Sequence, residues 1–509
     1  MPPDDLILWC CTGHGSNTCL MPDKTFITQT MNTFHNLING EWVASANSAP
    51  NVNPSDTSDI IGHYSQADAA QTEAAIAAAR AAFPAWSQST PQQRFDLLDA
   101  VGNELLARKE EIGWLLSREE GKTLPEGIGE TTRAAMIFKF FAGEALRCGG
   151  ETVPSVRPGV GVEVFRQPLG VVGLIAPWNF PIAIPAWKIA PALAYGNCVV
   201  FKPAELVPGC GWTLADLLHR SGVPKGAFNL VMGPGAVVGN SLVNSPRVDG
   251  ISFTGSVATG RRIISACAAR GAKVQAEMGG KNPLIVLDDA DLNVAVNSAV
   301  QSAYFSTGQR CTASSRILVT EGIHDRFNAA VIAKLSTLKI DHALKPGTDI
   351  GPVVDSRQLA SNLKYLEIAK SEGGTLAFGG EPVSCETQGF FQRPALITHT
   401  RPDMRINREE VFGPVASVVC VKDYDEALHF ANDTEFGLSA GICTTSLKYA
   451  THFKLNAQAG MVMVNVPTAG VDYHVPFGGR KGSSYGPREQ GSHAREFYTT
   501  VKTAYTAAS

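Results

Sequence analysis

Short apolar runs that alternate with helix-like segments constrain the fold of this chain more than any other feature. The runs are VVGLI at 171, NCVVF at 197, FNLVM at 228, GISFTG at 250, KVQAEM at 273 and PLIVLDD at 283. Strands that alternate with helical segments and end in glycine, proline or asparagine loops predict βαβ units and a parallel sheet, and therefore an α/β fold. Ligands bind at the carboxyl ends of such strands, so the loops after these runs are candidate sites.

Further elements are expected on both sides of this region. The Ala-rich stretch 68–83 favours a helix. The stretch 90–116 predicts one amphipathic helix, with Thr90 as N-cap and Pro91 at the first helical position. A second strand–helix series follows residue 312, through RILV at 316 and VASVVCV at 415. The alternating stretch 157–168 predicts a hairpin that leaves the main sheet.

Composition excludes several classes of partner and location. The 509 residues carry a net charge of −4, which gives no reason to expect nucleic acid or an anionic membrane as a partner. The uncharged stretch 170–187 contains Pro177, Pro181 and Pro185, which remove helix hydrogen bonds that lipid cannot replace, so we expect a buried strand and a loop instead of a membrane span. Eleven cysteines without a C-x-x-C pair indicate a reduced, cytoplasmic protein.

The N-terminal segment 1–34 contains one cluster of potential metal ligands. These are Cys10, Cys11, His14 and Cys19. As zinc ligands they would be unusually crowded, so we expect no metal site. The other interpretation is a disordered or mis-assigned extension, with the true start at Met21 or Met31. Acidic residues at the very beginning argue against a secretory leader.

Two loops have the composition of nucleotide-binding loops. Gly255 and Ser256, in FTGSVATGRR, follow a strand and open a predicted helix whose N–H groups would favour a phosphate; the alternative is a plain turn. Lys202 and Glu205, in FKPAE, could hold the hydroxyls of a ribose, or form an exposed ion pair. The nearby GPGAVVG does not match the G-x-G-x-x-G fingerprint.

Three residues are candidates for the chemistry itself. Cys311, in FSTGQRCTASS, lies among small and hydroxylated residues, whereas a thiol packed only as a hydrophobe usually has aliphatic neighbours. Asn179, in APWNFP, suits an oxyanion donor, or it holds its own turn. Glu277, in AEMGGKNP, suits a general base, or it is a helix-end glutamate.

A serine hydrolase is the alternative that another motif raises. GSSYG at 482–486 matches G-x-S-x-G. The nucleophile elbow needs a buried strand directly before it, and the preceding PFGGRKG is too rich in glycine and charge for that. Ser484 is therefore disfavoured as a nucleophile.

Taken in order, the motifs resemble those of the aldehyde dehydrogenase superfamily. The motifs are PWNFP, KPAE, FTGSVATG, EMGGKNP, FSTGQRCTASSR, EEVFGPV and PFGGRKGSS. The resemblance extends from about residue 35 to residue 500. Within the superfamily, FKPAELVPGCGWTLADLL and FSTGQRCTASSR are most similar to the α-ketoglutaric semialdehyde (2,5-dioxovalerate) dehydrogenases.

This resemblance implies roles for individual residues. Cys311 matches the nucleophile, Glu277 the base, Asn179 the oxyanion donor and Glu489 a carboxylate that relays protons. The matching cofactor contacts are Trp178, Lys202, Ala204, Glu205, Gly235, Gly239, Gly255, Ser256, Glu410 and Phe412. The matching substrate contacts are Phe180, Trp187, Arg310, Thr312 and Phe477. The implied cofactor is NAD or NADP, with NAD preferred because Glu205 would repel a 2′-phosphate.

The resemblance also implies a domain organisation. Residues 35–145 and 169–279 would form a Rossmann-type cofactor domain with a parallel sheet, and 280–480 an α/β catalytic domain. Residues 146–168 and 481–509 would form an oligomerisation arm built on a β-hairpin. A homodimer or homotetramer is the expected assembly.

The implied reaction is NAD(P)-dependent oxidation of a semialdehyde through a cysteine thiohemiacetal and a thioester. Glu277 favours release to water over transfer to coenzyme A, and a scaffold without catalysis is disfavoured because all three catalytic candidates are present. A succinic semialdehyde or broad-range enzyme remains the alternative. Trp187 occupies the position where succinic semialdehyde enzymes carry an arginine, so either the substrate is not succinic semialdehyde or another cation holds its carboxylate. Arg310 is one candidate, although its side chain could equally point away and pair with an acid.

Overall fold

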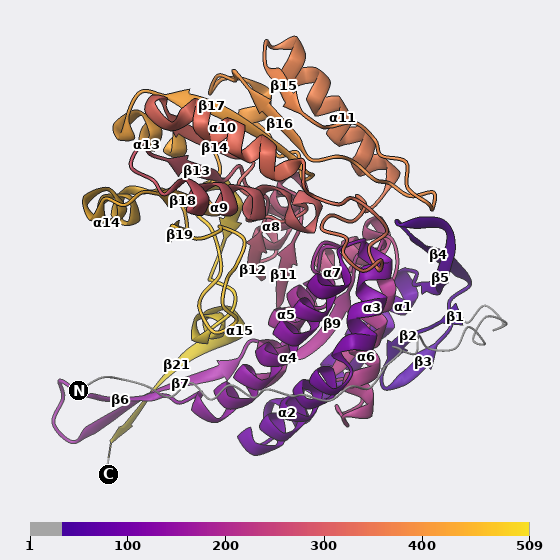
Figure 1. Ribbon diagram of the computed structural model, residues 1–509. Coiled ribbons are helices and arrows are strands. Elements are labelled where there is room, and N and C mark those ends of the chain that lie inside the picture. Colours follow the sequence, from indigo (N-terminus) through magenta and orange to yellow (C-terminus); the bar gives the residue numbers. More distant parts are fainter. Residues whose placement is uncertain (1–32, 508–509) are drawn as a thin grey trace, which may run out of the picture. The chain divides into compact units, whose positions relative to one another are not determined.

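The computed structural model describes residues 33–507 (Figure 1). Its largest sheet has eight strands. Their order is β20-β12-β11-β8-β9-β10-β2-β3. The strands are β2 (Asn36–Ile38), β3 (Glu41–Val43), β8 (Val171–Ile175), β9 (Cys198–Lys202), β10 (Phe228–Leu230), β11 (Gly250–Thr254), β12 (Lys273–Glu277) and β20 (Ser484–Tyr485). The central strands β12, β11, β8, β9 and β10 are all parallel. The predicted α/β fold with a parallel sheet is confirmed.

Strands β8, β9 and β11 are buried at every residue. Parallel strands covered on both faces read as continuous apolar runs, which is why VVGLI, NCVVF and GISFTG show no alternation. Because these strands are parallel, their carboxyl ends lie at one edge of the sheet. The loops that follow them, 176–182, 203–207, 255–256 and 278–282, are therefore neighbours.

Eight helices accompany this sheet in the sequence before residue 270. They are α1 (Ala69–Ser87), α2 (Pro91–Ala107), α3 (Lys109–Glu120), α4 (Leu124–Arg147), α5 (Ala183–Ala194), α6 (Pro208–Arg220), α7 (Asn240–Asn244) and α8 (Val257–Ala269). Thr90 and Gln93 form the capping box that begins α2. The stretch 90–116, expected to form a single helix, forms two helices, because Arg108 departs from helical geometry (φ −111°, ψ 19°). The apolar stripe keeps its spacing across this break, so periodicity could not reveal it.

A second sheet of seven strands follows in the sequence. Its order is β15-β16-β17-β14-β13-β18-β19. The strands are β13 (Pro283–Val286), β14 (Arg316–Thr320), β15 (Thr375–Phe378), β16 (Ala395–Thr398), β17 (Val415–Val421), β18 (Ser439–Cys443) and β19 (Met461–Val464). The runs at 273 and 283, which look like one pair in the sequence, thus belong to different sheets. The loop 278–282 connects the two sheets.

Seven more helices follow α8 within the described residues. They are α9 (Leu292–Tyr304), α10 (Glu321–Leu335), α11 (Ser356–Ser371), α12 (Arg405–Arg408), α13 (Tyr424–Asn432), α14 (Leu447–Asn456) and α15 (Arg495–Tyr498). Helix α9 leads directly into the short segment η3 (Phe305–Gly308), which precedes Cys311. The second region thereby places the candidate nucleophile beside the loops of the first sheet.

A separate antiparallel sheet contains β6 (Glu151–Pro154), β7 (Val160–Pro168) and β21 (Thr499–Ala507), in the order β21-β7-β6 (Figure 1). The hairpin expected within 157–168 is wrong in its bounds: most of that stretch is the single strand β7, and the hairpin is formed with β6. The predicted arm segment 481–509 is also divided. Ser484 pairs with Glu277 at the edge of the eight-stranded sheet, and only β21 joins the arm sheet.

The start of the described chain also differs by two residues from expectation. Thr33 and Phe34 form strand β1 (Thr33–Phe34), in a sheet with β4 (Asn47–Asn53) and β5 (Asp56–Gln66). The rest of the predicted extension, with its cluster of cysteines, lies outside the described residues. Every helix within 33–507 is too short or too polar to cross a bilayer. The same residues contain no group of three or more His, Cys, Asp or Glu side chains arranged to hold a metal ion.

Candidate active site

Cys311 follows a backbone segment with an unusual conformation. Ser306, Thr307 and Gly308 have φ of 51°, 55° and 66°, which places three consecutive residues in the left-handed region. Non-glycine residues rarely adopt it, and such conformations persist only where surrounding contacts enforce them. A strained segment directly before the candidate nucleophile marks this loop as functional.

The contacts that enforce this conformation come largely from one carboxylate. Glu126, in the first turn of α4, accepts hydrogen bonds from the backbone N–H of Ser306 (2.8 Å) and from its hydroxyl (2.9 Å). The Arg310 guanidinium binds the same oxygen of Glu126 (3.2 Å) and the Ser306 hydroxyl (2.8 Å). Of the two interpretations of Arg310, the structure therefore favours pairing with an acid. Arg310 is also not among the residues lining the cavity at Cys311, and its contact with substrate stays a prediction.

Asn179 lies beside the Cys311 loop, and its position is fixed from α4. Its side-chain amide donates to the backbone carbonyl of Gln309 (2.9 Å). The backbone carbonyl of Asn179 accepts a hydrogen bond from Lys122 Nζ (2.7 Å), and Lys122 also pairs with Glu130 (2.7 Å). Glu130 in turn accepts the backbone N–H groups of Ile182 and Ala183 at the start of α5.

Sequence reasoning missed this buried ion pair. Lys122 and Glu130 are 1% and 5% exposed. A buried charge requires a partner, so it is retained where it holds something in place. The only available signal was the charged EEGKT stretch at 119–123, and charge alone does not indicate burial.

A cavity of about 300 Å³ opens at Cys311 and brings together residues from both sheets. Its lining includes predicted residues Trp178, Asn179, Gly255, Ser256, Cys311, Glu410 and Phe412. The rings of Trp178 and Phe412 meet edge to face at 5.4 Å. Glu410 accepts from the backbone N–H of Gly280 (3.1 Å), and a Cβ at Gly279 would overlap its carboxylate. The paired glycines after Glu277 thus allow Glu410 to approach the loop.

Two further cavities continue from this one along the edge of the eight-stranded sheet. The second, of about 480 Å³, shares Trp178, Thr254 and Gln358 with the cavity at Cys311. The third, of about 530 Å³, shares Ile175, Lys202, Glu205 and Phe253 with the second. The predicted residue Ala204 lines the second cavity, and Gly235 and Gly239 line the third. An elongated site of this form fits a dinucleotide.

The donor groups in this elongated site also fit a dinucleotide. Lys202 Nζ donates to the carbonyl of Pro203 (2.9 Å) and lies 3.9 Å from Glu205. The Glu205 carboxylate accepts from the backbone N–H of Gly235 (2.8 Å) and faces the third cavity, where it can accept from a ribose diol. Helix α8 begins at Ser256 without a side-chain cap, so its first N–H groups remain available to a phosphate.

Glu277 ends strand β12 and is 2% exposed. Its carboxylate accepts a hydrogen bond from the Ser484 hydroxyl. Burial, with the nearby charge of Glu489, raises the pKa of Glu277 to about 8, although the Ser484 hydrogen bond acts in the opposite direction. Ser484 therefore contacts the candidate base, a role that the G-x-S-x-G match did not suggest.

The Cys311 thiol is held in its protonated form. Burial and the charges of Glu410 and Glu277 raise the pKa of Cys311 to about 12, and the backbone N–H groups of Cys311 and Thr312 oppose this only in part. The largest cause is burial of the sulfur, and the two carboxylates add to it.

The other predicted residues occupy positions around this centre. Glu489 pairs with the buried Lys188 and accepts from the Ser252 hydroxyl (3.1 Å). The rings of Trp187 and Phe477 lie 5.1 Å apart, and Phe180 lies over Lys122 at 3.9 Å. Thr312 is 7% exposed, and its carbonyl accepts from the Thr468 hydroxyl (2.8 Å). Their roles toward a substrate stay predictions.

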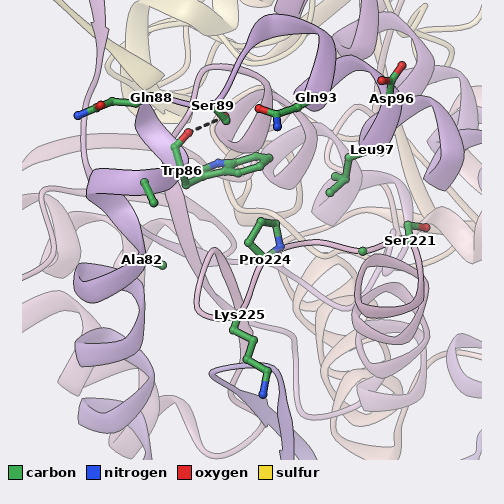
Figure 2. Close-up of a pocket in the computed structure, with 12 residues that line it drawn as sticks. Ala82, Trp86, Gln88, Ser89, Gln93, Asp96, Leu97, Ser221, Pro224 and Lys225 are labelled. Atoms are coloured by element: carbon green, nitrogen blue, oxygen red, sulfur yellow. Dashed lines mark hydrogen bonds between the residues drawn. The ribbon is translucent and has the colours of Figure 1, made fainter.

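A cavity of about 720 Å³ lies elsewhere, between α1, α2 and the turn after α6 (Figure 2). Trp86, Gln93, Asp96, Pro224 and Lys225 are among its lining residues. None of the predicted site residues contributes to it. Volume alone therefore does not select a candidate site, whereas Cys311, Asn179 and Glu410 all line the smaller cavity described above.

Comparison with known proteins gives consistent matches over most of the chain. Residues 42–504 match the sequence profile of the aldehyde dehydrogenase family. The chain is 43% identical over 479 residues to the alpha-ketoglutaric semialdehyde dehydrogenase of Bacillus subtilis, covering 93% of this chain and 98% of that protein. It is 42% identical to the alpha-ketoglutarate semialdehyde dehydrogenase of Haloferax volcanii, covering 92% and 98%.

Solved structures match equally well. The betaine aldehyde dehydrogenase of Staphylococcus aureus in complex with NAD⁺ superimposes with a TM-score of 0.90 at 35% identity, covering 93% of this chain and 94% of that one. An NADP-dependent enzyme of E. coli gives a TM-score of 0.91 at 35% identity, covering 94% and 98%. Enzymes described with either cofactor thus share this fold.

Proposed function

This chain belongs to the aldehyde dehydrogenase family, and we propose that its substrate is α-ketoglutaric semialdehyde, which it oxidises to 2-oxoglutarate. It is an oxidoreductase that acts on an aldehyde with a nicotinamide cofactor. The observation that carries the proposal is the cavity where Cys311 and Asn179 meet, in a chain 43% identical to an alpha-ketoglutaric semialdehyde dehydrogenase. The succinate-semialdehyde dehydrogenase of Arabidopsis thaliana is less similar, at 37% identity.

In the proposed mechanism, Cys311 attacks the aldehyde carbon and forms a thiohemiacetal. The side-chain amide of Asn179 and the backbone N–H of Cys311 hold the developing oxyanion. The bound nicotinamide supplies the acceptor for the hydride that leaves the substrate carbon. Glu277 then takes a proton from the water that releases the acid from the Cys311 thioester.

Proton transfer at Cys311 needs a base, because the resting thiol is protonated. Glu277 and Glu410 are the carboxylates whose charges act on Cys311. Glu277 ends the strand next to the Cys311 cavity and has a pKa of about 8, so a fraction of it is ionised near neutral pH. We assign Glu277 as the group that accepts the thiol proton, and Ser484 as the residue that orients it. Glu277 then passes this proton to solvent, so that its carboxylate is free again to accept the proton of the water that hydrolyses the thioester.

NAD is the cofactor that we propose. Glu205 faces the third cavity and accepts from Gly235, an arrangement that suits a ribose diol and repels a 2′-phosphate. Arg262 lines the same cavity, and its positive charge would instead attract a 2′-phosphate. Replacement of Glu205 by Gln should therefore raise the ratio of kcat/KM with NADP to kcat/KM with NAD; an unchanged ratio would show that Glu205 does not select the cofactor.

The two large sheets support a division into a cofactor domain and a catalytic domain, with the boundary in the loop 278–282. The sheet of β6, β7 and β21 supports an oligomerisation arm, so we propose a homodimer or homotetramer. We also propose a cytoplasmic location, because the cysteines within residues 33–507 are all free thiols.

The experiment that tests the proposed function is a comparison of kcat/KM across aldehydes with both cofactors. The panel contains α-ketoglutaric semialdehyde, succinic semialdehyde, betaine aldehyde and pentanal. We expect the highest value for α-ketoglutaric semialdehyde with NAD. A preference for pentanal or betaine aldehyde would remove the acid-semialdehyde assignment, and a preference for succinic semialdehyde would move it to the shorter acid.

A further inference from the structure

Three buried hydrogen-bond donors on neighbouring side chains have no acceptor among residues 33–507. They are Nε of Arg133, Nε2 of Gln490 and Nε1 of Trp187. The Arg133 guanidinium donates to the Gln490 side-chain oxygen (3.2 Å) and lies 5.7 Å from the centre of the Trp187 ring. Buried polar atoms nearly always have partners, so three orphaned donors in one cluster require an explanation.

Packing and backbone conformation fix the positions of these three side chains. Gln490 is 0% exposed and has a φ of 57°, a conformation that costs energy for a residue with a side chain. Trp187 is 5% exposed and packs on Phe477. The three side chains come from α4, from α5 and from the segment after Glu489. Contacts among elements distant in the sequence thus hold these three side chains next to one another.

The cluster lies near the candidate nucleophile. Ile184 lines the Cys311 cavity, and Trp187 follows it by three residues on the same face of α5, about one helical turn farther along. A negative charge on Cys311 would act directly on the Arg133 guanidinium. The carboxyl carbon of a five-carbon ω-aldehyde acid lies four C–C bonds from the aldehyde carbon, about 5–6 Å in extended form.

The hydrogen-bond donors and the positive charge of the cluster favour an anionic ligand. All three free groups are donors, and a guanidinium stays charged, so they suit a carboxylate with two acceptor oxygens. The carboxylates whose charges act on Arg133 are Glu130 and Asp472. Glu130 is already paired with Lys122, and Asp472 is exposed and forms no ion pair with Arg133. Arg133 therefore retains its capacity to bind an incoming anion.

We propose that Arg133, with Gln490 and Trp187, binds the carboxylate at the far end of the substrate. The inference rests on the proposed function, since it assumes an acid semialdehyde. It supplies the cation that the site needs, because Trp187 carries no charge and Arg310 is engaged by Glu126. An unpaired carboxylate in a buried tunnel would otherwise be too costly.

The test compares kcat/KM for α-ketoglutaric semialdehyde with kcat/KM for pentanal, a neutral aldehyde of equal length. In Arg133→Gln, the ratio of acid to neutral aldehyde should fall at least tenfold. Arg310→Gln is the matched control: it should change both values by the same factor, because Arg310 positions the Cys311 loop. A ratio within threefold of wild type in Arg133→Gln would overturn the proposal and leave Arg133 as a packing partner of Trp187.

Gln490→Glu gives a second test that keeps Arg133 and the shape of the side chain. The new carboxylate would occupy the guanidinium and repel the substrate, so the same ratio should again fall at least tenfold. If Arg133→Gln does not fold, this variant alone decides, and an unchanged ratio overturns the proposal. A wild-type enzyme that prefers pentanal would contradict the proposed function instead, before any variant is compared.

Discussion

Cys311, Glu277 and Glu410 are acidic groups in one small region, where Glu277 is buried and the other two are partly buried, and loss of contact with water raises the pKa of each. The values are about 12 for Cys311, about 8 for Glu277 and about 7 for Glu410. Each ionised group also disfavours ionisation of its neighbours, so the site holds few negative charges at rest. At the scale of single residues, the reactivity of the site thus depends on which carboxylate is ionised.

Cys311→Ala should abolish aldehyde oxidation and leave cofactor binding intact. The substitution removes the sulfur that forms the thiohemiacetal, while the cavities at Lys202, Glu205 and Gly235 remain. Turnover is measured by absorbance of the reduced cofactor, and binding by calorimetric titration with NAD. Oxidation near the wild-type rate would contradict the assignment of Cys311.

The hydrolytic step should depend on pH through Glu277. Because the pKa of Glu277 is raised to about 8, the carboxyl is mostly neutral at pH 7 and becomes the active base as pH rises. Ser484→Ala removes a hydrogen bond that stabilises the carboxylate, so the pKa should rise further and the rate should increase at higher pH than in wild type. Steady-state rates across pH 6–10 measure this, and an unshifted profile would exclude Ser484 as a positioning residue.

At the scale of elements, the first turn of α4 controls the loop that carries Cys311. Glu126 binds Ser306 and Arg310, and Lys122 and Glu130 connect the same region to Asn179 and to the start of α5. These contacts maintain the left-handed residues before Cys311 and align the oxyanion donor with it. The start of α4 thereby sets the positions of Cys311 and Asn179, although Glu126, Lys122 and Glu130 contact neither substrate nor cofactor.

Arg310→Ala should lower kcat/KM for acid and neutral aldehydes by the same factor. The guanidinium bridges Glu126 and Ser306, so its loss relaxes the strained loop and misplaces Cys311 whatever the substrate carries at its far end. The measurement is kcat/KM for α-ketoglutaric semialdehyde and for pentanal. A selective loss on the acid would return Arg310 to the role of carboxylate ligand.

At the scale of the whole molecule, the sheet of β6, β7 and β21 offers an exposed surface for a second copy. Phe165, Val501 and Tyr505 are 41%, 60% and 63% exposed on its strands. Strand β21 pairs with β7 along its length and has no partner on its other edge among residues 33–507. An exposed edge strand with apolar side chains is a site for pairing between chains.

Lysine at both Val501 and Tyr505 should reduce the size of the oligomer. Two charges on an edge strand oppose pairing with another chain. Light scattering coupled to size-exclusion chromatography measures the mass of the particle. Leu455→Lys is the matched control, because Leu455 is 80% exposed on α14, outside the arm sheet. An unchanged mass in the double variant would place the interface elsewhere.

The fold class and the family could be predicted from the sequence, and the site residues could be proposed from it. Continuous apolar runs such as VVGLI encode buried parallel strands, because every face of these strands must be apolar. Asn179 lies in the loop after β8 and Glu277 ends β12, so the topology of a parallel sheet brings these two together, whereas Cys311 follows α9 and η3. These features are local, so they can be read from a single chain.

Only the tertiary structure decided side-chain direction, ionisation and pairing between distant segments. Arg310 turned toward Glu126, and Arg133, which the sequence did not single out, met Trp187 and Gln490, residues 54 and 357 positions away in the chain. The split of the segment after residue 480 between two sheets, and the protonated state of Cys311, also depend on neighbours distant in the sequence. The physical reason is that burial and Coulomb interactions act through space, and a linear pattern of residue types does not contain those distances.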